Sequence, residues 1–194
     1  MRLKTHRFSL ILATCLGSSG VCQNVTQSSQ LSPLPGTGPL RPATGESFSF
    51  IVAGDSRPAR ADLPLPSIPG KIFAPARTLN PAFIVWTGDA IFGLDDAHPA
   101  VISRQYQAFF KIARQAGVPV FMAPGNHEMD VKIPIPGSSA IREIGSAQMQ
   151  ALYRQNMKLP SDAPLYGAFR YGNSRFIVPA ASARHTQESA QEAR

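Results

Sequence analysis

Residues 118–128 have the sequence Val-Pro-Val-Phe-Met-Ala-Pro-Gly-Asn-His-Glu. The first six residues form a short apolar run, and a cluster of glycine and polar side chains follows directly at 124–128. A short run rich in β-branched and aromatic side chains predicts a buried strand, and the glycine and asparagine predict its end. We therefore expect a strand that leads into a polar loop.

The same pattern occurs twice more upstream. Residues 82–89, Ala-Phe-Ile-Val-Trp-Thr-Gly-Asp, and residues 48–57, Phe-Ser-Phe-Ile-Val-Ala-Gly-Asp-Ser-Arg, are apolar runs that each lead into Gly-Asp. Asp55 and Asp89 are 34 positions apart, and Asp89 and Asn126 are 37 apart. Each separation is about the length of one βαβ unit, of roughly 30 or more residues.

Helices are predicted between and after these runs. Apolar residues recur at steps of four and three from Ile102 to Ala116, which predicts an amphipathic helix, and a shorter helix is predicted around residues 72–79. Another half-buried helix is predicted around residues 141–154, and a hairpin over 169–178. Strands that alternate with helices predict an α/β fold, whose parallel strands bring the three polar clusters to one edge of the sheet.

The side chains at that edge predict metal-dependent chemistry. Asp55, Asp89 and Asn126 carry hard oxygen donors, and His127 is an imidazole beside them. Two carboxylates in a partly dry cleft repel each other unless a cation lies between them, and a carboxylate such as Asp89 can bridge two cations. Two metals would activate a hydroxide for attack on phosphorus, while His127 protonates the departing oxygen, so phosphoester hydrolysis is the leading hypothesis.

The three clusters also carry a family resemblance. Gly54-Asp55-Ser56-Arg57, Gly88-Asp89 and Gly125-Asn126-His127-Glu128 resemble the first three motifs of the calcineurin-like metallophosphoesterases. The resemblance implies that Asp55 binds one metal, Asp89 bridges two, Asn126 binds the second, and His127 acts on the leaving group. It also implies two divalent cofactor ions, Mn, Fe or Zn. Arg57 stands where many members have a histidine ligand, and its planar fork suits substrate phosphate.

The C-terminal part departs from the family pattern. The family's Gly-His-x-His pair is missing, and residues 179–194 contain no Val, Ile, Leu, Met or aromatic residue, which predicts a disordered tail. These features predict an incomplete sandwich, truncated or frameshifted at its C-terminal end. An inactive truncated fragment is therefore the alternative function. A serine esterase of the GDS type, with Ser56 as nucleophile, is a remote alternative.

The N-terminal segment predicts export. Basic residues before position 8, an apolar run at 8–16 and small residues after it are typical of a signal peptide, predicted at 1–22. The run is shorter than the roughly 20 residues that span a bilayer. Residues 23–47, rich in Ser, Gln, Pro and Gly, predict a flexible leader before a partial phosphoesterase domain at 48–178. We expect the mature protein to be secreted or periplasmic, without a transmembrane helix.

Charge and composition limit the partners. The formal charge is +7, but without residues 1–20 it falls to +4, from 16 basic and 12 acidic side chains, and no basic run remains. This balance gives no signal for nucleic-acid binding. The expected partner is a phosphoester substrate, either a small molecule or a protein, and the motifs leave open monoester, diester, nucleotide and phosphoprotein.

Overall fold

The central feature of the fold is a parallel three-stranded sheet. The computed structural model describes residues 31–45, 47–94 and 98–180. Strands β1 (Ile51–Ala53), β2 (Ile84–Trp86) and β3 (Val120–Met122) pair side by side in the order β1-β2-β3, all parallel. The α/β class and the parallel arrangement of the three apolar runs are therefore confirmed. Each strand is shorter than its apolar run, because only the central residues pair.

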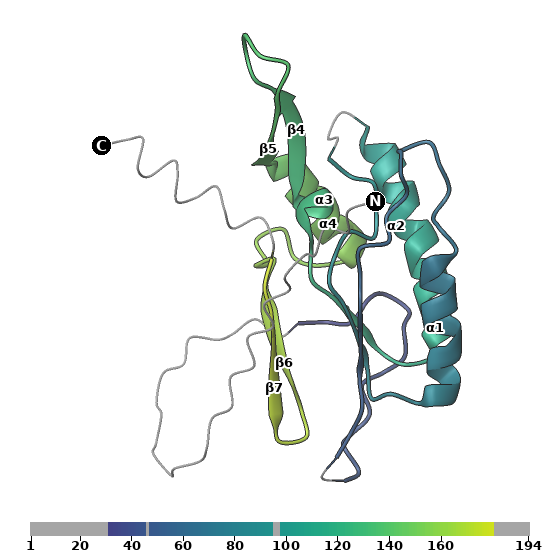
Figure 1. Ribbon diagram of the computed structural model, residues 1–194. Coiled ribbons are helices and arrows are strands. Elements are labelled where there is room, and N and C mark those ends of the chain that lie inside the picture. The colour runs from purple at the N-terminus through teal and green to yellow at the C-terminus, as the bar shows by residue number, and fades with distance from the viewer. Residues whose placement is uncertain (1–30, 46, 95–97, 181–194) are drawn as a thin grey trace, which may run out of the picture.

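Helices cover one face of this sheet. Helix α1 (Ile68–Leu79) connects β1 to β2, and α2 (Pro99–Ala113), extended by a 3₁₀ turn at Arg114–Ala116, connects β2 to β3. Both predicted helices are confirmed, and Figure 1 shows them on the side of the sheet away from the C-terminal hairpin. Ile84 and Trp86 face these helices, where they share one core with Phe73 and Phe109.

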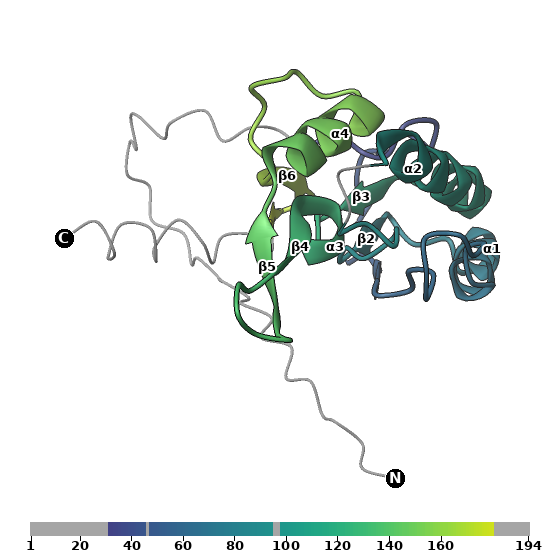
Figure 2. The ribbon, with the colours of Figure 1, turned by 90° about the horizontal axis from the view of Figure 1, so that it is seen from above.

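A hairpin of aromatic residues covers the other face. Strands β6 (Gly167–Tyr171) and β7 (Ser174–Val178) pair antiparallel, which confirms the predicted hairpin. Phe83 and Phe121 point to this face, as the two-residue period of a strand requires. The ring of Phe169 stacks on that of Phe121 with centroids 3.8 Å apart and meets Phe83 edge-on at 5.0 Å. Strands β2 and β3 are thus covered by the helices on one face and by the hairpin on the other (Figure 2), whereas Val52 of β1 is 49% exposed.

The helix predicted around residues 141–154 is wrong in its first part. Residues Ile141–Gly145 form strand β5, which pairs antiparallel with β4 (Asp130–Pro134), and helix α4 covers only Ala147–Met157. The helix begins there because the hydroxyl of Ser146 accepts the backbone N–H of Met149 at 3.2 Å and so caps it. In Figure 1 the β4–β5 hairpin extends beyond the single-turn helix α3 (Asn126–Met129).

Part of the predicted leader packs on the domain. The backbone N–H of Leu34 donates to the Val120 carbonyl at 2.7 Å, that of Gly38 to the Val118 carbonyl at 3.2 Å, and the Leu34 side chain is 1% exposed in the helix-side core. Residues 31–38 are therefore an ordered part of the fold, although their composition predicts a flexible leader. The predicted signal peptide and most of the predicted tail lie outside the described residues. No helix in the described ranges is long and apolar enough to cross a membrane.

The docked segment makes a testable contribution to stability. We expect Leu34→Ala to lower the free energy of unfolding by about 2–3 kcal/mol, because it leaves a cavity in the main core. Leu79→Ala is the matched control, since that leucine ends α1 and is 66% exposed, and it is expected to change stability by less than about 0.5 kcal/mol. Urea unfolding followed by circular dichroism measures both. Equal effects of the two substitutions would mean that residues 31–38 do not dock in solution.

Candidate functional site

The loops after β1, β2 and β3 are joined at the carboxyl edge of the sheet. The backbone N–H of Asp55 donates to the Gly88 carbonyl at 3.0 Å, and that of Ser56 donates to the Asp89 carbonyl at 3.2 Å. Asp55 and Asp89 both have positive φ angles, 53° and 55°, a conformation that aspartate tolerates better than most residues. The structure therefore brings these two predicted ligands to neighbouring loops, as the strand pattern predicts.

Glu128 holds the second and third loops together. Its Oε2 accepts the backbone N–H groups of Gly125 at 2.7 Å and Asp89 at 2.9 Å, and its Oε1 accepts those of Ala90 at 2.8 Å and Ile91 at 3.4 Å. The side chain is fully buried. Burial raises the pKa of Glu128 to about 7, and the neighbouring Asp89 carboxylate adds to the rise. Glu128 therefore supports the loops through hydrogen bonds.

Asp89 carries an oxygen for which the described residues provide no partner. Its Oδ1 is buried without a hydrogen bond, and a Cβ added to Gly125 would lie 2.2 Å from it. Only glycine at position 125 leaves room for this oxygen. Burial raises the pKa of the Asp89 carboxyl, His127 opposes that rise, and the Asp55 carboxylate adds to it. A buried carboxylate oxygen without a donor is suited to bind a cation.

Arg57 brings positive charge to the same place. It interacts electrostatically with Asp89 and with His127, yet its Nε is buried without a partner among the described residues, and its Nη1 makes only a 3.4 Å contact to the Pro58 carbonyl. A guanidinium with unused donors fits a phosphate oxygen pair. The hydroxyl of Ser56, 5% exposed, also lacks a partner there, and its burial is unfavourable for the nucleophile of a serine esterase.

His127 is oriented by the loop after β2. Its Nδ1 contacts the backbone carbonyl of Phe92, and the ring is 4% exposed. A carbonyl oxygen can only accept, so Nδ1 carries a proton and Nε2 is the nitrogen left for substrate. Burial lowers the pKa of His127, and the Phe92 carbonyl and the Asp89 carboxylate act in the opposite direction.

Asn126 is oriented by the β4–β5 hairpin. Its Nδ2 donates to Oε2 of Glu143 at 2.8 Å, and Oε1 of Glu143 lies 3.7 Å from Nζ of Lys132, its cross-strand partner. Because the amide nitrogen is held by a carboxylate, the oxygen of Asn126 is directed away from Glu143 and is the atom left for a ligand.

The donor set fits a divalent cation, although it is small. Two carboxylates, an amide oxygen and an imidazole are ligands that Mn, Fe and Zn accept. Within the described ranges, however, no group of three or more His, Cys, Asp or Glu side chains is placed to hold a metal ion. Asp55 is exposed, whereas Asp89 and Asn126 are half-buried. The described residues thus provide three candidate oxygen ligands at this edge and the hydrogen bonds that hold their loops.

Sequence reasoning missed two polar side chains near this edge. Gln105 of α2 contacts the loops after β1 and β2, and Glu143 holds Asn126. A signal existed for Gln105, because it lies on the apolar stripe of its helix between Ile102 and Phe109 and a polar residue there needs partners. Glu143 had no signal, since its contact depends on the unpredicted β4–β5 pairing.

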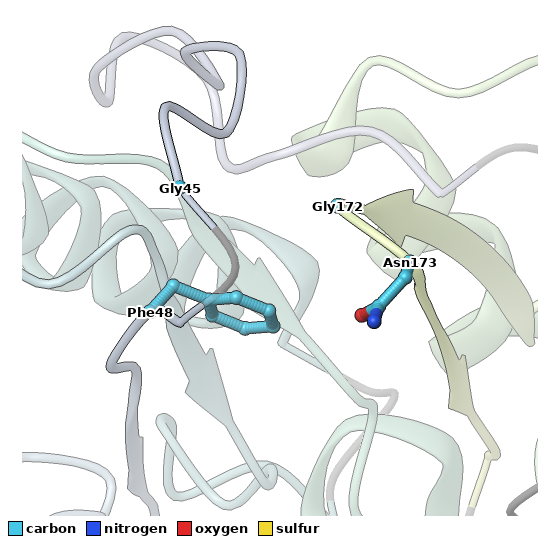
Figure 3. Close-up of a pocket in the computed structure, with 4 residues that line it drawn as sticks. All are labelled: Gly45, Phe48, Gly172 and Asn173. Carbon is cyan, nitrogen blue, oxygen red and sulfur yellow. The ribbon is translucent and has the colours of Figure 1, made fainter.

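A separate hollow of about 460 Å³ lies away from this edge. Gly45, Phe48, Gly172 and Asn173 line it, near the turn between β6 and β7 and before the start of β1. Figure 3 shows the Phe48 ring and the Asn173 side chain extending toward one another across it. None of these four described lining residues has an ionisable side chain.

The chain is similar to known proteins at two levels, a solved structure and a family model. Among solved structures, the purple acid phosphatase PPD1 from seeds of yellow lupin (Lupinus luteus) is similar, with 18% sequence identity and a TM-score of 0.49. The alignment covers 83% of this chain and 28% of the lupin chain, so this chain spans less than a third of that enzyme. No curated protein sequence matches significantly.

A family model, that of the calcineurin-like phosphoesterases, matches residues 67–182, which is more than half of the chain. The matched part contains Asp89, Asn126 and His127 and begins after Asp55 and Arg57. The comparison with the lupin structure adds nothing to this assignment at that level of similarity. On the family match, this chain belongs to the calcineurin-like phosphoesterase family, whose members are hydrolases of phosphoesters.

Proposed function

We propose that this protein hydrolyses phosphoesters with two divalent cations, either Mn, Fe or Zn. Asp55 and Asn126 would each hold one ion, and Asp89 would bridge both. The observation that carries the proposal is the buried Asp89 Oδ1 without a hydrogen-bond partner among the described residues, beside Arg57 and His127. When bound, the cations would supply Lewis acidity that neutralises phosphate charge and lowers the pKa of water.

The chain's own residues would perform the remaining tasks. Arg57 would bind and orient the phosphate through its unused guanidinium donors. His127, with its Nδ1–H held by the Phe92 carbonyl, would take up a second proton on Nε2 and pass that proton to the departing oxygen. Glu128 would keep the loops after β2 and β3 in register. We further propose that the protein acts after export, on a small-molecule or protein phosphoester.

Hydrolysis of aryl phosphates tests this proposal. We expect the purified full chain to release nitrophenol from a monoester or a diester in Mn²⁺, Fe²⁺ or Zn²⁺, and a chelator to abolish turnover. Asp89→Asn keeps the side-chain shape but removes the charge, so kcat/KM is expected to fall by about a hundredfold or more. Asp162→Asn, an exposed position, is the matched control and is expected to leave the rate unchanged.

Three results would count against the proposal. Turnover that survives the chelator and is blocked by a serine-directed phosphonate would favour a serine esterase. Turnover that is unchanged in Asp89→Asn would show that the carboxyl edge of the sheet is not the active site. No turnover with any of the three metals would favour an inactive member of the family, an alternative consistent with the absence of a group of three or more ionisable ligands in the described ranges.

A further inference from the structure

Gln105 is a buried polar side chain outside the three motifs. It lies on α2 at 7% exposure, on the helix face that packs against the sheet. A glutamine can donate and accept at the same time, and here both ends of the amide are used. Its Oε1 accepts the backbone N–H of Phe92 at 2.8 Å, and its Nε2 donates to the Ala61 carbonyl at 3.0 Å.

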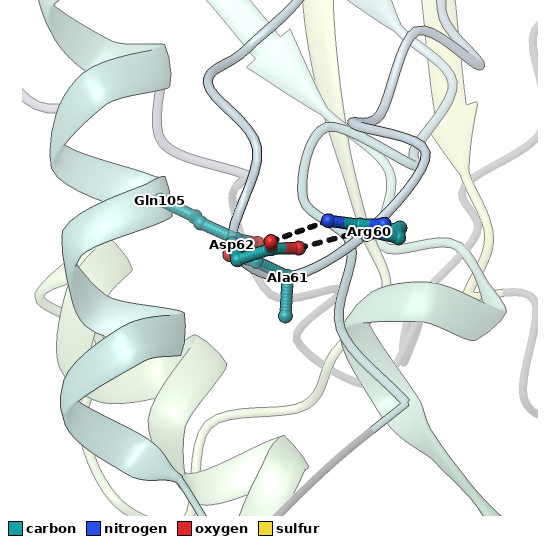
Figure 4. Close-up of polar contacts among 4 residues, drawn as sticks. All are labelled: Arg60, Ala61, Asp62 and Gln105. Carbon is teal, nitrogen blue, oxygen red and sulfur yellow. Dashed lines mark hydrogen bonds and ion pairs between the residues drawn. The ribbon is translucent and has the colours of Figure 1, made fainter.

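The two contacts of Gln105 reach two different loops of the candidate site. Ala61 belongs to the loop that follows β1 and carries Arg57 four residues earlier. Figure 4 shows Gln105 extending from its helix to this loop, beside the exposed ion pair between Arg60 and Asp62, whose closest atoms are 2.6 Å apart. The Arg60–Asp62 pair joins two residues of the same loop. Of the four residues drawn in Figure 4, Gln105 is the one that reaches this loop from a helix.

Phe92 connects Gln105 to His127. The N–H of Phe92 is held by Gln105, and the carbonyl of the same residue contacts Nδ1 of His127. The next two residues of this loop contact the backbone of His127. The N–H of Leu94 donates to the His127 carbonyl at 3.4 Å, and a Cβ on Gly93 would overlap that carbonyl. A shift of the Phe92 backbone would therefore turn the imidazole.

We propose that Gln105 is a positioning residue that keeps the loop of Arg57 and the imidazole of His127 in register. Gln105 holds the loop of Arg57 through the Ala61 carbonyl, and it holds the imidazole of His127 through the backbone of Phe92. The inference rests on the proposed phosphoesterase function, since it concerns how Arg57 is placed toward the phosphate and His127 toward the leaving group. No apolar residue of similar length replaces it, because the half-buried Phe92 N–H would lose its acceptor.

Paired substitutions separate the two contacts. Gln105→Met removes both hydrogen bonds at similar length, and we expect kcat to fall about tenfold because the imidazole loses its alignment. Gln105→Glu keeps an acceptor for the Phe92 N–H and loses the donor for the Ala61 carbonyl, so it should keep kcat near the wild-type value and raise KM several-fold. Gln107→Met, an exposed position on the same helix, is the control and should change neither.

A second readout does not depend on turnover. The chain has four histidines, so ¹⁵N-histidine labelling gives few signals, and a His127→Asn variant assigns the one of interest. In the wild type we expect the His127 ring to carry its proton on Nδ1. In Gln105→Met we expect a mixture of the two neutral tautomers, whereas Gln105→Glu should keep the wild-type signal.

The outcomes distinguish this inference from the proposed function. If the wild type shows no turnover, the proposed function is rejected. The His127 signal in Gln105→Met then tests by itself whether Gln105 positions the imidazole. Wild-type kcat together with a wild-type His127 signal in Gln105→Met overturns the inference and leaves the phosphoesterase proposal intact. If Gln105→Met does not fold, Gln105→Glu decides: retained kcat with raised KM supports the inference, and lost kcat with unchanged KM overturns it.

Discussion

Glu128→Ala is expected to lower the free energy of unfolding by about 4 kcal/mol. Four backbone N–H groups donate to the Glu128 carboxylate, and alanine leaves all four without an acceptor. Each buried donor that loses its partner costs about 1–3 kcal/mol, which relief from burying the carboxylate offsets only in part. The expected loss is therefore a large fraction of the stability of a domain of this size, which is typically about 5–15 kcal/mol.

Two further variants test whether the loss in Glu128→Ala comes from its hydrogen bonds. Glu128→Gln keeps one acceptor oxygen and places an amide nitrogen against the remaining donors, so we expect an intermediate loss of about 2 kcal/mol. Asp162→Ala, an exposed carboxylate, is expected to change stability by less than about 0.5 kcal/mol. Urea unfolding of the metal-free protein, followed by circular dichroism, measures all three. A Glu128→Ala protein as stable as Asp162→Ala would show that this carboxylate does not join the loops.

Gly93→Ala is expected to destabilise the protein by about 4 kcal/mol or to prevent folding, because it combines backbone strain with a steric clash. Gly93 has a φ of +55°, which L side chains rarely adopt, and a Cβ built on it lies 1.6 Å from the His127 carbonyl oxygen. The neighbouring atom is backbone, so it cannot move without breaking the contacts that hold the imidazole. We therefore expect turnover to be lost together with stability.

Gly137 provides a closely matched control for this clash. It also has a positive φ, +75°, but a Cβ there has no neighbour within 4 Å. Gly137→Ala should therefore show the strain alone, about 1 kcal/mol, with turnover unchanged. Thermal unfolding and the aryl phosphate assay compare the two variants directly. Equal losses in both would assign the effect to φ and not to the contact between Gly93 and His127.

The sequence pattern predicted the strands, their parallel order and the gathering of three loops. Such predictions succeed because strand burial and βαβ connection are local, repeated signals. Within the third loop, Glu128 provides support through four N–H contacts. The metal and substrate roles of Asp55, Asp89, Asn126, His127 and Arg57 stay predictions.

Two other features of the fold could not be predicted from local sequence patterns. Ile141 and Ile144 fit a helical spacing as well as a strand, and only pairing with β4 decides for the strand. Leu34 lies in a stretch whose composition is typical of a linker, and its burial depends on contact with β3, more than 80 residues later. In both cases the deciding interaction is distant in sequence.

What the sequence determined by itself was which chemistry reaches the carboxyl edge of the sheet. An apolar run of five or six residues followed by Gly-Asp or Gly-Asn-His-Glu predicts both a strand and the polar loop at its end, and both predictions come from contiguous residues. The tertiary structure alone decided how that edge is held. The edge is held by individual hydrogen bonds from Gln105, Glu143 and the Phe92 carbonyl to residues 13 to 44 positions away. Such bonds produce no periodic pattern in a sequence.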